Sequence, residues 1–576
     1  MKGNTKLYIV FMLILLAVAC SKDWLDERPL GSYDQYTLAN EKGIDGILIG
    51  AYSMLDGVSN PYSWEAASSN WIYGSIRGME ANKGTDAGDP GDINALQNFS
   101  ELPTHPYLAV KWRELYDAIN RCNSCIVITG IAFDEGTIDQ TKADLFIRQA
   151  RVLRGWYHFE AWRLWKKIPY VDEKTIQDTL TNSWDASSRI IDDLAQGTGL
   201  PDNVGAIGRF NGTVSRILLA KALMQMKGDY AAALVLLNQA KSGTKPNGEA
   251  IGLAAKYGDV FDTQNRNGIE AIYTVQYSVN DGSGGWNGGW GEVLNFPYKS
   301  GASPGGCCGF FQPTQEFVNS FRTSGGLPLL DNSYNSNPVI SDEGVKPADP
   351  FIEDAGPLDP RLDWTVGRRG IPYLDWGIHT GADWIRDQTY AGPYSPKKQV
   401  YKKSQQAFYT ESNNWTGGFT ANGYRMIRYA DLLLLIAECQ IETNDLPGAR
   451  LNINLVRARA ANPDGFVKES DGTTNAANYV ITTYPLSGYP FDSQANARLA
   501  LRMERKLELG MEGHRFFDLN RWGITVTELN RALTYEKTQY WGHSMYGSAV
   551  VGPEDVTFPI PQTQIVQGKG RIIQNR

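Results

Sequence analysis

A helix–turn–helix pattern that occurs twice in the chain is the feature that most restricts its fold. Residues 228–233 and 444–449 each contain a turn residue, then an aspartate, then an alanine four positions later. Apolar positions flank both turns in the same register, so that Leu218 corresponds to Leu434. The small alanine would let the second helix of each pair approach the first. Such a hairpin must stack on neighbours to bury its apolar face, which predicts tetratricopeptide-like packing into a superhelix.

Helical periodicity extends through both ends of the chain. Apolar residues recur at 3.6-residue spacing in 146–164 and again in 429–437, and 500–511 continues as a third helix. The first helix should stop before Ile168, since a proline follows that residue. We therefore expect a mainly α protein.

The middle of the chain, residues 262–424, is rich in Gly, Pro, Asn, Asp and Trp and has few long periodic segments. Residues 269–277 alternate like a strand, and turn signals follow closely. Because helices of the earlier type resume afterwards, we interpret 37–576 as one domain. Its N-terminal helical part would be 37–261, its large irregular, loop-rich insertion 262–424, and its C-terminal helical part 425–576.

The start of the chain predicts export. Lys2 and Lys6 precede an uncharged run at 7–18, which is too short to span a membrane but fits a signal peptide covering 1–19. Cleavage before Cys20 resembles processing at a bacterial lipobox, although Ala17 stands where leucine is usual. Residues 20–36 would then be a lipid-anchored tether. The alternative is an ordinary cleaved signal with an incidental cysteine.

Charge and aromatic content narrow the class of ligand. The chain has 55 Lys and Arg against 63 Asp and Glu, a net charge of −8 without a basic run, so nucleic acid is a poor candidate partner. Its 16 Trp, 29 Tyr and 20 Phe are unusual and raise the possibility of an exposed stacking surface.

The cysteines beyond Cys20 give little support for a site. Cys122 and Cys125 match C-x-x-C inside an expected helix, but without further ligands they do not make a zinc site, and burial is favoured over a redox role. Cys307 and Cys308 are adjacent between glycines, and a vicinal disulfide there is left open.

Several blocks in a fixed order resemble one protein family. They are WLDERP at 24–29, RQARVLRGWYHF at 148–159, IPYV at 168–171, DPR at 359–361, RMIRYADLL at 425–433, AE at 437–438, NLVRARA at 454–460, ERKLELGMEGHRFFDLNRW at 504–522, FPIPQ at 558–562 and QN at 574–575. Together they resemble the SusD/RagB family of outer-membrane nutrient-uptake lipoproteins from Bacteroidetes-type bacteria, over essentially the whole mature chain.

The resemblance implies a helical, tetratricopeptide-containing body whose inserted loops bind oligosaccharide at the cell surface. It also implies a partner, a SusC-like TonB-dependent outer-membrane barrel, to which the ligand is delivered without any bond being broken. The protein would be held in the outer membrane by the lipid on Cys20. Because RagB-like members handle peptides, a peptide ligand stays an alternative.

Three carboxylates at helical spacing raise a second alternative, a glycoside hydrolase. Glu504, Glu508 and Glu512 fall on one helical face, and a glycosidase needs a pair of carboxylates. The favoured interpretation is structural, with ion pairs to Arg505, Arg515 and Arg521, which lie close by in the sequence.

Other catalytic motifs are weak. Ser303 lies in a formal G-x-S-x-G, but the proline that follows argues against a nucleophile elbow. None of the five histidines forms a metal-ligand pair with another, and His158 is expected to pack in a helix core. We expect no catalytic residue, no metal and no cofactor.

The aromatic loops remain as the candidate binding site. Sugar rings stack their C–H faces on Trp or Tyr while their hydroxyls bond to nearby polar side chains, and pockets combine these two kinds of surface. Trp286 and Trp290 are the hardest to explain as core, since glycines surround them in a long loop. The predicted glycan-binding residues are Trp71, Tyr73, Lys83, Asp86, Trp286, Trp290 and Trp376.

Overall fold

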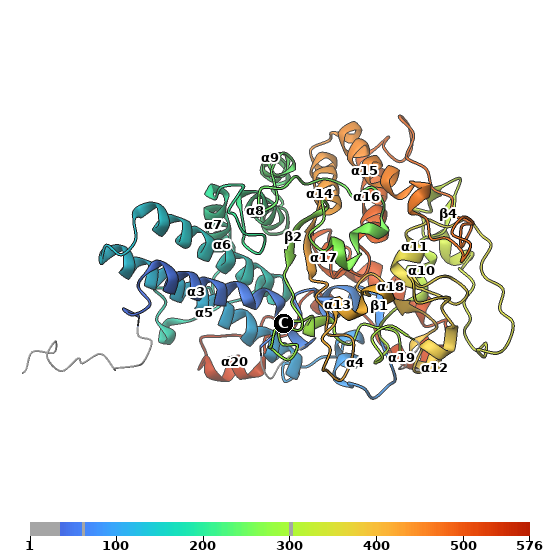
Figure 1. Ribbon diagram of the computed structural model, residues 1–576, viewed down its shortest axis with the longest axis horizontal. Helices are drawn as coiled ribbons and strands as arrows, with labels where there is room; N and C mark the ends of the chain where they lie inside the picture. Colours follow the sequence, from blue (N-terminus) through green and yellow to red (C-terminus); the bar gives the residue numbers. More distant parts are fainter. Residues whose placement is uncertain (1–34, 60–63, 299–302) are drawn as a thin grey trace, which may run out of the picture.

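The helices of the two ends of the chain lie side by side, and the loop-rich middle covers one flank of them (Figure 1). The computed structural model describes residues 35–59, 64–298 and 303–576. The predicted signal peptide at 1–19, Cys20 and most of the predicted tether lie outside the described residues. Within the described ranges, no helix combines the length and the apolar character needed to cross a membrane.

Long helices dominate the first part of the chain. α5 and α6 fold back on one another, and α3 packs on α5. Asp139 caps the start of α6 by accepting the N–H of Lys142. The helices of this part are α3 (Glu41–Ser53), α4 (Asp92–Gln97), α5 (Pro106–Asp134), α6 (Gln140–Trp165), α7 (Ser187–Gln196), α8 (Gly212–Lys227) and α9 (Tyr230–Lys241). As expected, α6 ends before Ile168.

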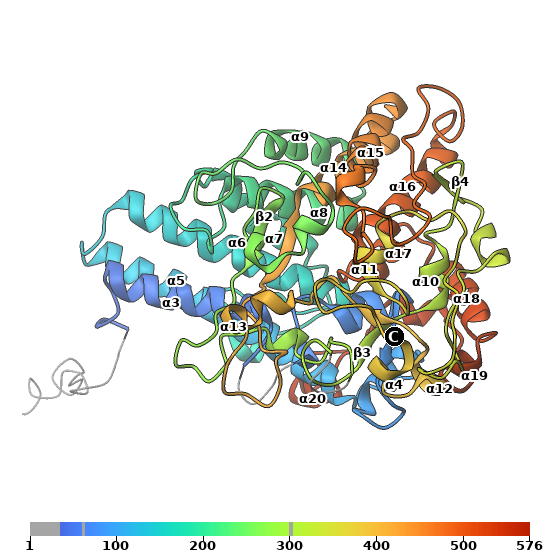
Figure 2. The same cartoon turned by 45° about the vertical axis from the view of Figure 1, so that its right-hand side comes forward.

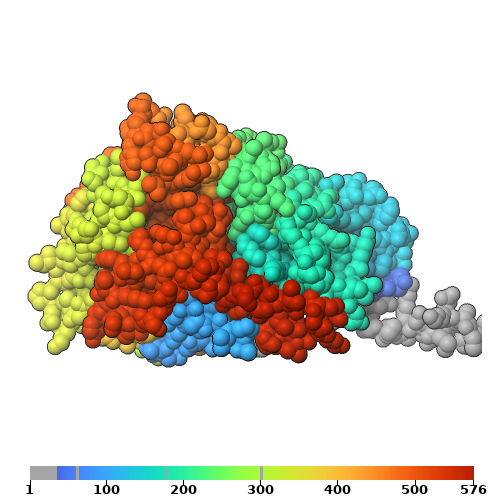
Figure 3. Space-filling view, turned by 180° about the vertical axis from the view of Figure 1, so that it is seen from behind, coloured from blue at the N-terminus to red at the C-terminus, as the bar shows by residue number. Residues whose placement is uncertain are grey.

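The last part of the chain continues the helical stack. α9 packs against α14, and α14 packs against both α15 and α16, so hairpins far apart in the sequence lie next to each other (Figure 2). The helices are α14 (Tyr429–Glu442), α15 (Leu446–Ala460), α16 (Gln494–Leu509), α17 (Arg515–Arg521), α18 (Thr525–Glu536), α19 (Tyr540–Tyr546) and α20 (Gln562–Gln567). From behind, the red C-terminal segment crosses beneath both groups of hairpins (Figure 3).

The sequence repeat corresponds to two hairpins with the same turn. Gly228 separates α8 from α9 at φ 63°, and Asn444 separates α14 from α15 at φ 65°. Both residue types tolerate this left-handed conformation. Asp229 and Asp445 then cap the second helices by accepting an N–H three residues on. The alanine four positions later is fully buried in both copies. The tetratricopeptide-like pairing is confirmed.

Short elements fill the middle of the chain, and β1 from the first part of the chain joins them. The strands pair into two-stranded antiparallel sheets, β1 with β3, β2 with β8, β4 with β5 and β6 with β7. The elements are β1 (Ala81–Gly84), β2 (Ala271–Val275), β3 (Phe310–Pro313), α10 (Gln315–Asn319), β4 (Thr323–Ser324), β5 (Leu327–Pro328), α11 (Leu362–Thr365), β6 (Val366–Gly367), α12 (Gln388–Ala391), β7 (Ser395–Pro396), α13 (Gln406–Tyr409) and β8 (Tyr424–Arg428). The mainly α class is confirmed.

The β2–β8 pair marks where the loop-rich middle joins the helices. Ala271 pairs with Arg428, and the N–H of Tyr429 donates to the carbonyl oxygen of Glu270 at 2.9 Å. The chain therefore leaves the helical stack and returns to it at one place, directly before α14. The assignment of 262–424 as an insertion in a single domain stays a prediction.

Candidate functional site

Two loops of the middle segment are tied together into one surface. The 278–290 loop and the 409–421 loop share a backbone bond, from the Gly289 N–H to the Thr420 oxygen at 2.9 Å. Asn280 adds a side-chain bond to the oxygen of Thr410 at 2.9 Å. Gly285 has φ 90°, and a Cβ there would lie 2.7 Å from the Asn414 side chain. A glycine is thus required both by the backbone conformation and by the approach of the second loop.

Four aromatic rings pack where these loops meet, and we call them the aromatic platform: Trp286, Trp290, Trp415 and Phe419. Trp286 stacks on Trp290 with ring centroids 4.6 Å apart. Trp290 and Trp415 both meet Phe419 edge to face, at 4.5 and 5.6 Å. Phe419 is buried, whereas Trp415 is 55% exposed and Trp286 is half-buried. The buried ring of Phe419 therefore positions the exposed indole of Trp415 and supports Trp290, on which Trp286 stacks.

Polar side chains that hydrogen-bond to the loop backbone border the platform. Asp281 accepts from Asn287 Nδ2 at 2.8 Å. Bonds from Ser278, Ser283 and Asn287 hold the pKa of the Asp281 carboxyl well below its usual range. From the 409–421 loop, Glu411 accepts the N–H of Asn280 at 2.7 Å. The border thus presents fixed hydrogen-bond acceptors beside aromatic faces.

Trp376 lies in the same set of loops. It is half-buried, and its Nε1 donates to the Tyr401 oxygen at 2.9 Å. The Tyr401 hydroxyl accepts the N–H of Gly305, whose oxygen in turn accepts the N–H of Gly417. Through this chain of bonds Trp376 is linked to the loop that carries Trp415. Lys403 Nζ lies 5.8 Å from the Trp376 ring centroid.

Lys83 and Asp86 belong to a third group at this end of the molecule. Asp86 pairs with Arg386 at 2.8 Å and is partly exposed. Lys83 is fully buried, with its Nζ bonded to the carbonyl oxygens of Asp86 and Asp89, and burial lowers its pKa to about 8. Contrary to the expectation that it contacts ligand hydroxyls, Lys83 holds its own loop together.

Trp71 and Tyr73 are core residues, which corrects the expectation that they stack on a ligand. Each is only 1% exposed. Trp71 Nε1 donates to the oxygen of Gly291 at 2.8 Å, and the Tyr73 hydroxyl donates to the oxygen of Glu65 at 2.7 Å. Trp71 thus supports the base of the 278–290 loop from beneath. Trp71 therefore supports the platform from inside the protein and is not part of its solvent-exposed surface.

Trp415 is the exposed ring that the sequence prediction missed. It lies in Asn-Asn-Trp-Thr-Gly-Gly, residues 413–418, the same combination of glycines and amides around a tryptophan that singled out Trp286. The pattern of a tryptophan among glycines and amides, which identified Trp286, is therefore present in this segment too. Of the predicted site residues, the structure brings Trp286 and Trp290 together, with Trp376 in linked loops.

The helical carboxylates are sealed inside the protein. Glu504, Glu508 and Glu512 are buried in ion pairs, as the structural interpretation required, but their predicted partners are wrong. Arg505, for example, pairs with Asp431 and Asp518 instead. The linked groups form what we call the buried ion network: Glu270, Asp359, Glu504, Glu508, Glu512, Arg361, Arg428, Arg457, Arg459 and Lys398.

The remaining candidates are also structural. Cys122 and Cys125 are buried free thiols, and burial raises the pKa of both, in the case of Cys125 to about 12. Cys307 and Cys308 form the vicinal disulfide that the sequence left open. His158 is buried and stacked on Tyr170, as expected, with its pKa lowered to about 4 by burial. Among the described residues, no cluster of His, Cys, Asp and Glu is arranged to hold a metal.

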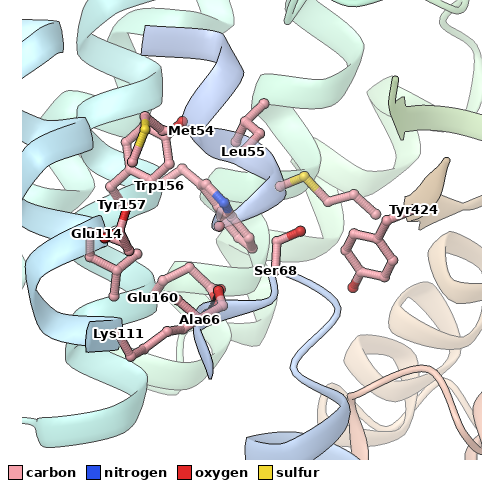
Figure 4. Close-up of a pocket in the computed structure, with 13 residues that line it drawn as sticks. Met54, Leu55, Ala66, Ser68, Lys111, Glu114, Trp156, Tyr157, Glu160 and Tyr424 are labelled. Carbon is pink, nitrogen blue, oxygen red and sulfur yellow. Dashed lines mark hydrogen bonds between the residues drawn. The ribbon is translucent and has the colours of Figure 1, made fainter. Parts of the chain in front are cut away.

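Other hollows lie in the helical part. A small cavity of about 20 Å³, lined by Lys111 and Glu160 among others, has room for about one water molecule (Figure 4). A wide groove of about 1030 Å³ runs between α5, the 169–180 segment and α20. The tryptophan in it, Trp112, is buried and stacked against Tyr116 at 4.8 Å. Trp156, which lines the cavity, is half-buried, so neither hollow has an indole as exposed as Trp415, and the platform is the stronger site for stacking.

Comparison with known proteins agrees with the sequence resemblance. Residues 269–576 match the SusD family. SusD-like protein P25 from Formosa agariphila is 22% identical over 97% of this chain and 96% of its own length. A SusD homolog from Bacteroides thetaiotaomicron has a TM-score of 0.67 at 20% identity, covering 93% of this chain and 97% of that one. Surface glycan-binding protein A from Bacteroides thetaiotaomicron, solved with laminarihexaose, gives 0.65 at 19% identity, covering 93% and 99%. This chain belongs to the SusD family.

Proposed function

We propose that this protein captures oligosaccharides on the aromatic platform and delivers them to a SusC-like TonB-dependent barrel in the outer membrane. The observation that carries the proposal is the platform itself, in which the exposed Trp415 and the half-buried Trp286 lie on either side of the packed rings of Trp290 and Phe419. Stacking of sugar rings on such indoles leaves the hydroxyls free to bond to the carboxylates and amides at the border. Binding and transfer need no bond to be broken, so the protein would act without catalysis.

Trp376 extends the proposed site. Its linked loops would contact further sugar units, and Asp86 would lie at the edge of the same surface. In this proposal residues 262–424 carry the ligand loops, and the helices on either side form the scaffold. Surface glycan-binding protein A, which shares this fold, was solved with a laminarin oligosaccharide, and that supports a glycan as the ligand class.

The lipid on Cys20 and the barrel complete the proposal. A tether at 20–36 would hold the protein at the outer membrane while the folded part moves relative to the barrel. The partnership is tested by purifying the affinity-tagged full chain in detergent and asking whether a SusC-like protein encoded by a neighbouring gene co-purifies with it. A Cys20→Ala variant found in the soluble fraction would support the anchor, whereas unchanged membrane fractionation would argue against it.

Binding is tested by affinity electrophoresis and calorimetry against a panel of polysaccharides. We expect Trp415→Ala and Trp286→Ala to weaken binding of the cognate glycan about fivefold or more, since stacking of a ring on an aromatic side chain contributes about 1–3 kcal/mol in a comparable setting. Trp184→Ala is the matched control, because Trp184 is 41% exposed but lies away from the loops. Wild-type affinity in both platform variants would refute the site.

Assays on the same purified protein distinguish two other functions. A RagB-like protein would bind oligopeptides and ignore every glycan in the panel. A glycoside hydrolase would release reducing ends from a polysaccharide on prolonged incubation. The burial of Glu504, Glu508 and Glu512 removes the carboxylates that suggested hydrolysis, and this favours binding alone.

A further inference from the structure

The border of the platform is acidic. Across the 278–290 and 410–420 segments the sequence has Asp281 and Glu411 but no Lys or Arg. The other polar side chains there are amides and hydroxyls, such as Asn287 and Asn414. Any ligand resting on Trp286 or Trp415 therefore meets negative charge and neutral dipoles from these loops, and no cation.

Both carboxylates are fixed in place. Asp281 accepts the N–H of Ser283 at 2.9 Å and the amide of Asn287 at 2.8 Å. Glu411 accepts the N–H of Asn280, and that residue's side-chain oxygen accepts the N–H of Ser412. Bonds from backbone and amide donors stabilise the charged form of a carboxylate. The charges thus stay beside the indoles and cannot swing away when a ligand arrives.

A neutral sugar suits this border, because its hydroxyls donate to the carboxylates. A uronate or sulfate group in the same position would be repelled. At 4 Å one like charge costs about 1 kcal/mol in bulk water, so the two carboxylates together would weaken binding about tenfold or more. The neighbouring Trp376 differs, since Lys403 lies beside its ring. Trp376 therefore provides an aromatic ring beside a cation, with which the acidic border of the platform can be compared.

We infer that the platform accepts uncharged oligosaccharides and rejects those that carry uronate or sulfate groups next to the stacked rings. This inference rests on the proposed glycan-binding function and specifies its ligand class. It concerns the sugars that contact Trp286 and Trp415, while charged units further along a chain could still reach Trp376.

The test uses matched polysaccharides. A panel of neutral glucans, mannans and galactans is compared with the same polymers oxidised at C6 to uronates, by affinity electrophoresis and calorimetry with the full folded protein. We expect a neutral polymer to bind and its oxidised form to bind at least about tenfold more weakly at low salt. The difference should narrow at high salt, because surface charges are screened. It should also narrow in the Asp281→Asn, Glu411→Gln double variant.

The outcomes separate the inference from the function on which it rests. Equal or tighter binding of an oxidised polymer, abolished by Trp415→Ala, would overturn the selectivity while leaving glycan binding intact. Binding of an oxidised polymer that survives Trp415→Ala but is lost in Trp376→Ala would place acidic sugars at the other ring and support selectivity at the platform. If no polymer of either kind binds, the proposed function fails and the inference fails with it. Thermal melts of each variant confirm folding.

Discussion

Removing one charge from the buried ion network should destabilise the protein measurably. Glu508 lies at its centre and accepts from Arg361 at 3.1 Å, Arg428 at 3.0 Å and Arg459 at 2.5 Å. The network has as many carboxylates as cations, and its side chains are almost completely excluded from solvent. Glu508→Gln keeps the shape of the side chain but leaves one positive charge uncompensated.

The size of the effect follows from burial. Breaking a buried pair by removing one partner costs about 3–5 kcal/mol, because the remaining charge has no water to solvate it. Unfolding entropy is about 2.1 cal/mol/K per residue near 60 °C, or about 1.2 kcal/mol/K for 576 residues. We therefore expect Glu508→Gln to lower the melting temperature by about 3–4 °C.

The assay is thermal unfolding by circular dichroism or differential scanning fluorimetry at neutral pH. Glu41→Gln is the control, since Glu41 pairs with Lys142 at the surface, with the two side chains 56% and 45% exposed. Surface pairs contribute little, so this variant should melt within about 1 °C of wild type. If Glu508→Gln melts like the control, the network does not stabilise the fold as argued. Loss of a wild-type hydrolytic activity in Glu508→Gln would instead restore the glycosidase alternative.

Three further predictions follow from buried groups and from the hairpin turn. Burial lowers the folded-state pKa of His158 to about 4 from an ordinary 6.5. The contribution of neutral His158 to stability should therefore be complete above pH 6.5 and should be lost, by up to about 3 kcal/mol, as the pH falls towards 4. Thermal melts recorded across that pH range measure the loss. Gly228→Ala should lower stability by about 1 kcal/mol, since alanine is strained at φ 63°, whereas an unchanged denaturation midpoint would mean that the turn adapts. The thiols of Cys122 and Cys125 should resist alkylation in the folded protein at pH 8 and react only on unfolding, as mass spectrometry would show, because burial raises the pKa of each.

The helical hairpins were predictable because their determinants are local. Gly228 and Asn444 adopt the left-handed conformation that a tight turn requires, and the next residue in each case is an aspartate suited to capping a helix. Each signal lies within a few residues of the structure it specifies. The pairing of α9 with α14 brings two such units together, as a stacking repeat demands.

The burial of aromatic rings was not predictable in the same way. Trp71 looks like a loop residue in the sequence because polar residues and glycines follow it, but its bonding partner Gly291 is 220 residues away. Whether a tryptophan is covered depends on which distant loop packs over it. Local composition identified Trp286 and would have identified Trp415, yet it could not distinguish either from Trp71.

The ion-pair partners predicted for the buried carboxylates were wrong for a related reason. Glu504 and Arg505 are adjacent in α16, and neighbours along a helix do not face each other. Arg505 accordingly turns towards Asp431, while Glu504 meets Arg361 from the loop-rich middle at 2.6 Å. Proximity in sequence suggested the wrong partners, although the number and burial of the charges already indicated that partners had to exist.

The position of the ion network explains how the loop-rich segment is attached to the helical scaffold. Glu270 lies directly before β2 and Arg428 at the end of β8, so both ends of the loop-rich segment contribute charges to it. Arg361 and Lys398 come from within that segment, and Glu508 and Glu512 come from α16 and the turn after it. The segment is thus fixed to the hairpins at its base by bonds that ligand-contacting residues do not share. The tips that carry Trp286 and Trp415 are held instead by the bond from the Gly289 N–H to the Thr420 oxygen and by side-chain bonds of Asn280, Glu411 and Asn414 between the two loops. We therefore expect substitutions at the tips to affect the proposed ligand binding without disturbing the attachment, and substitutions in the network to alter stability without changing the aromatic platform.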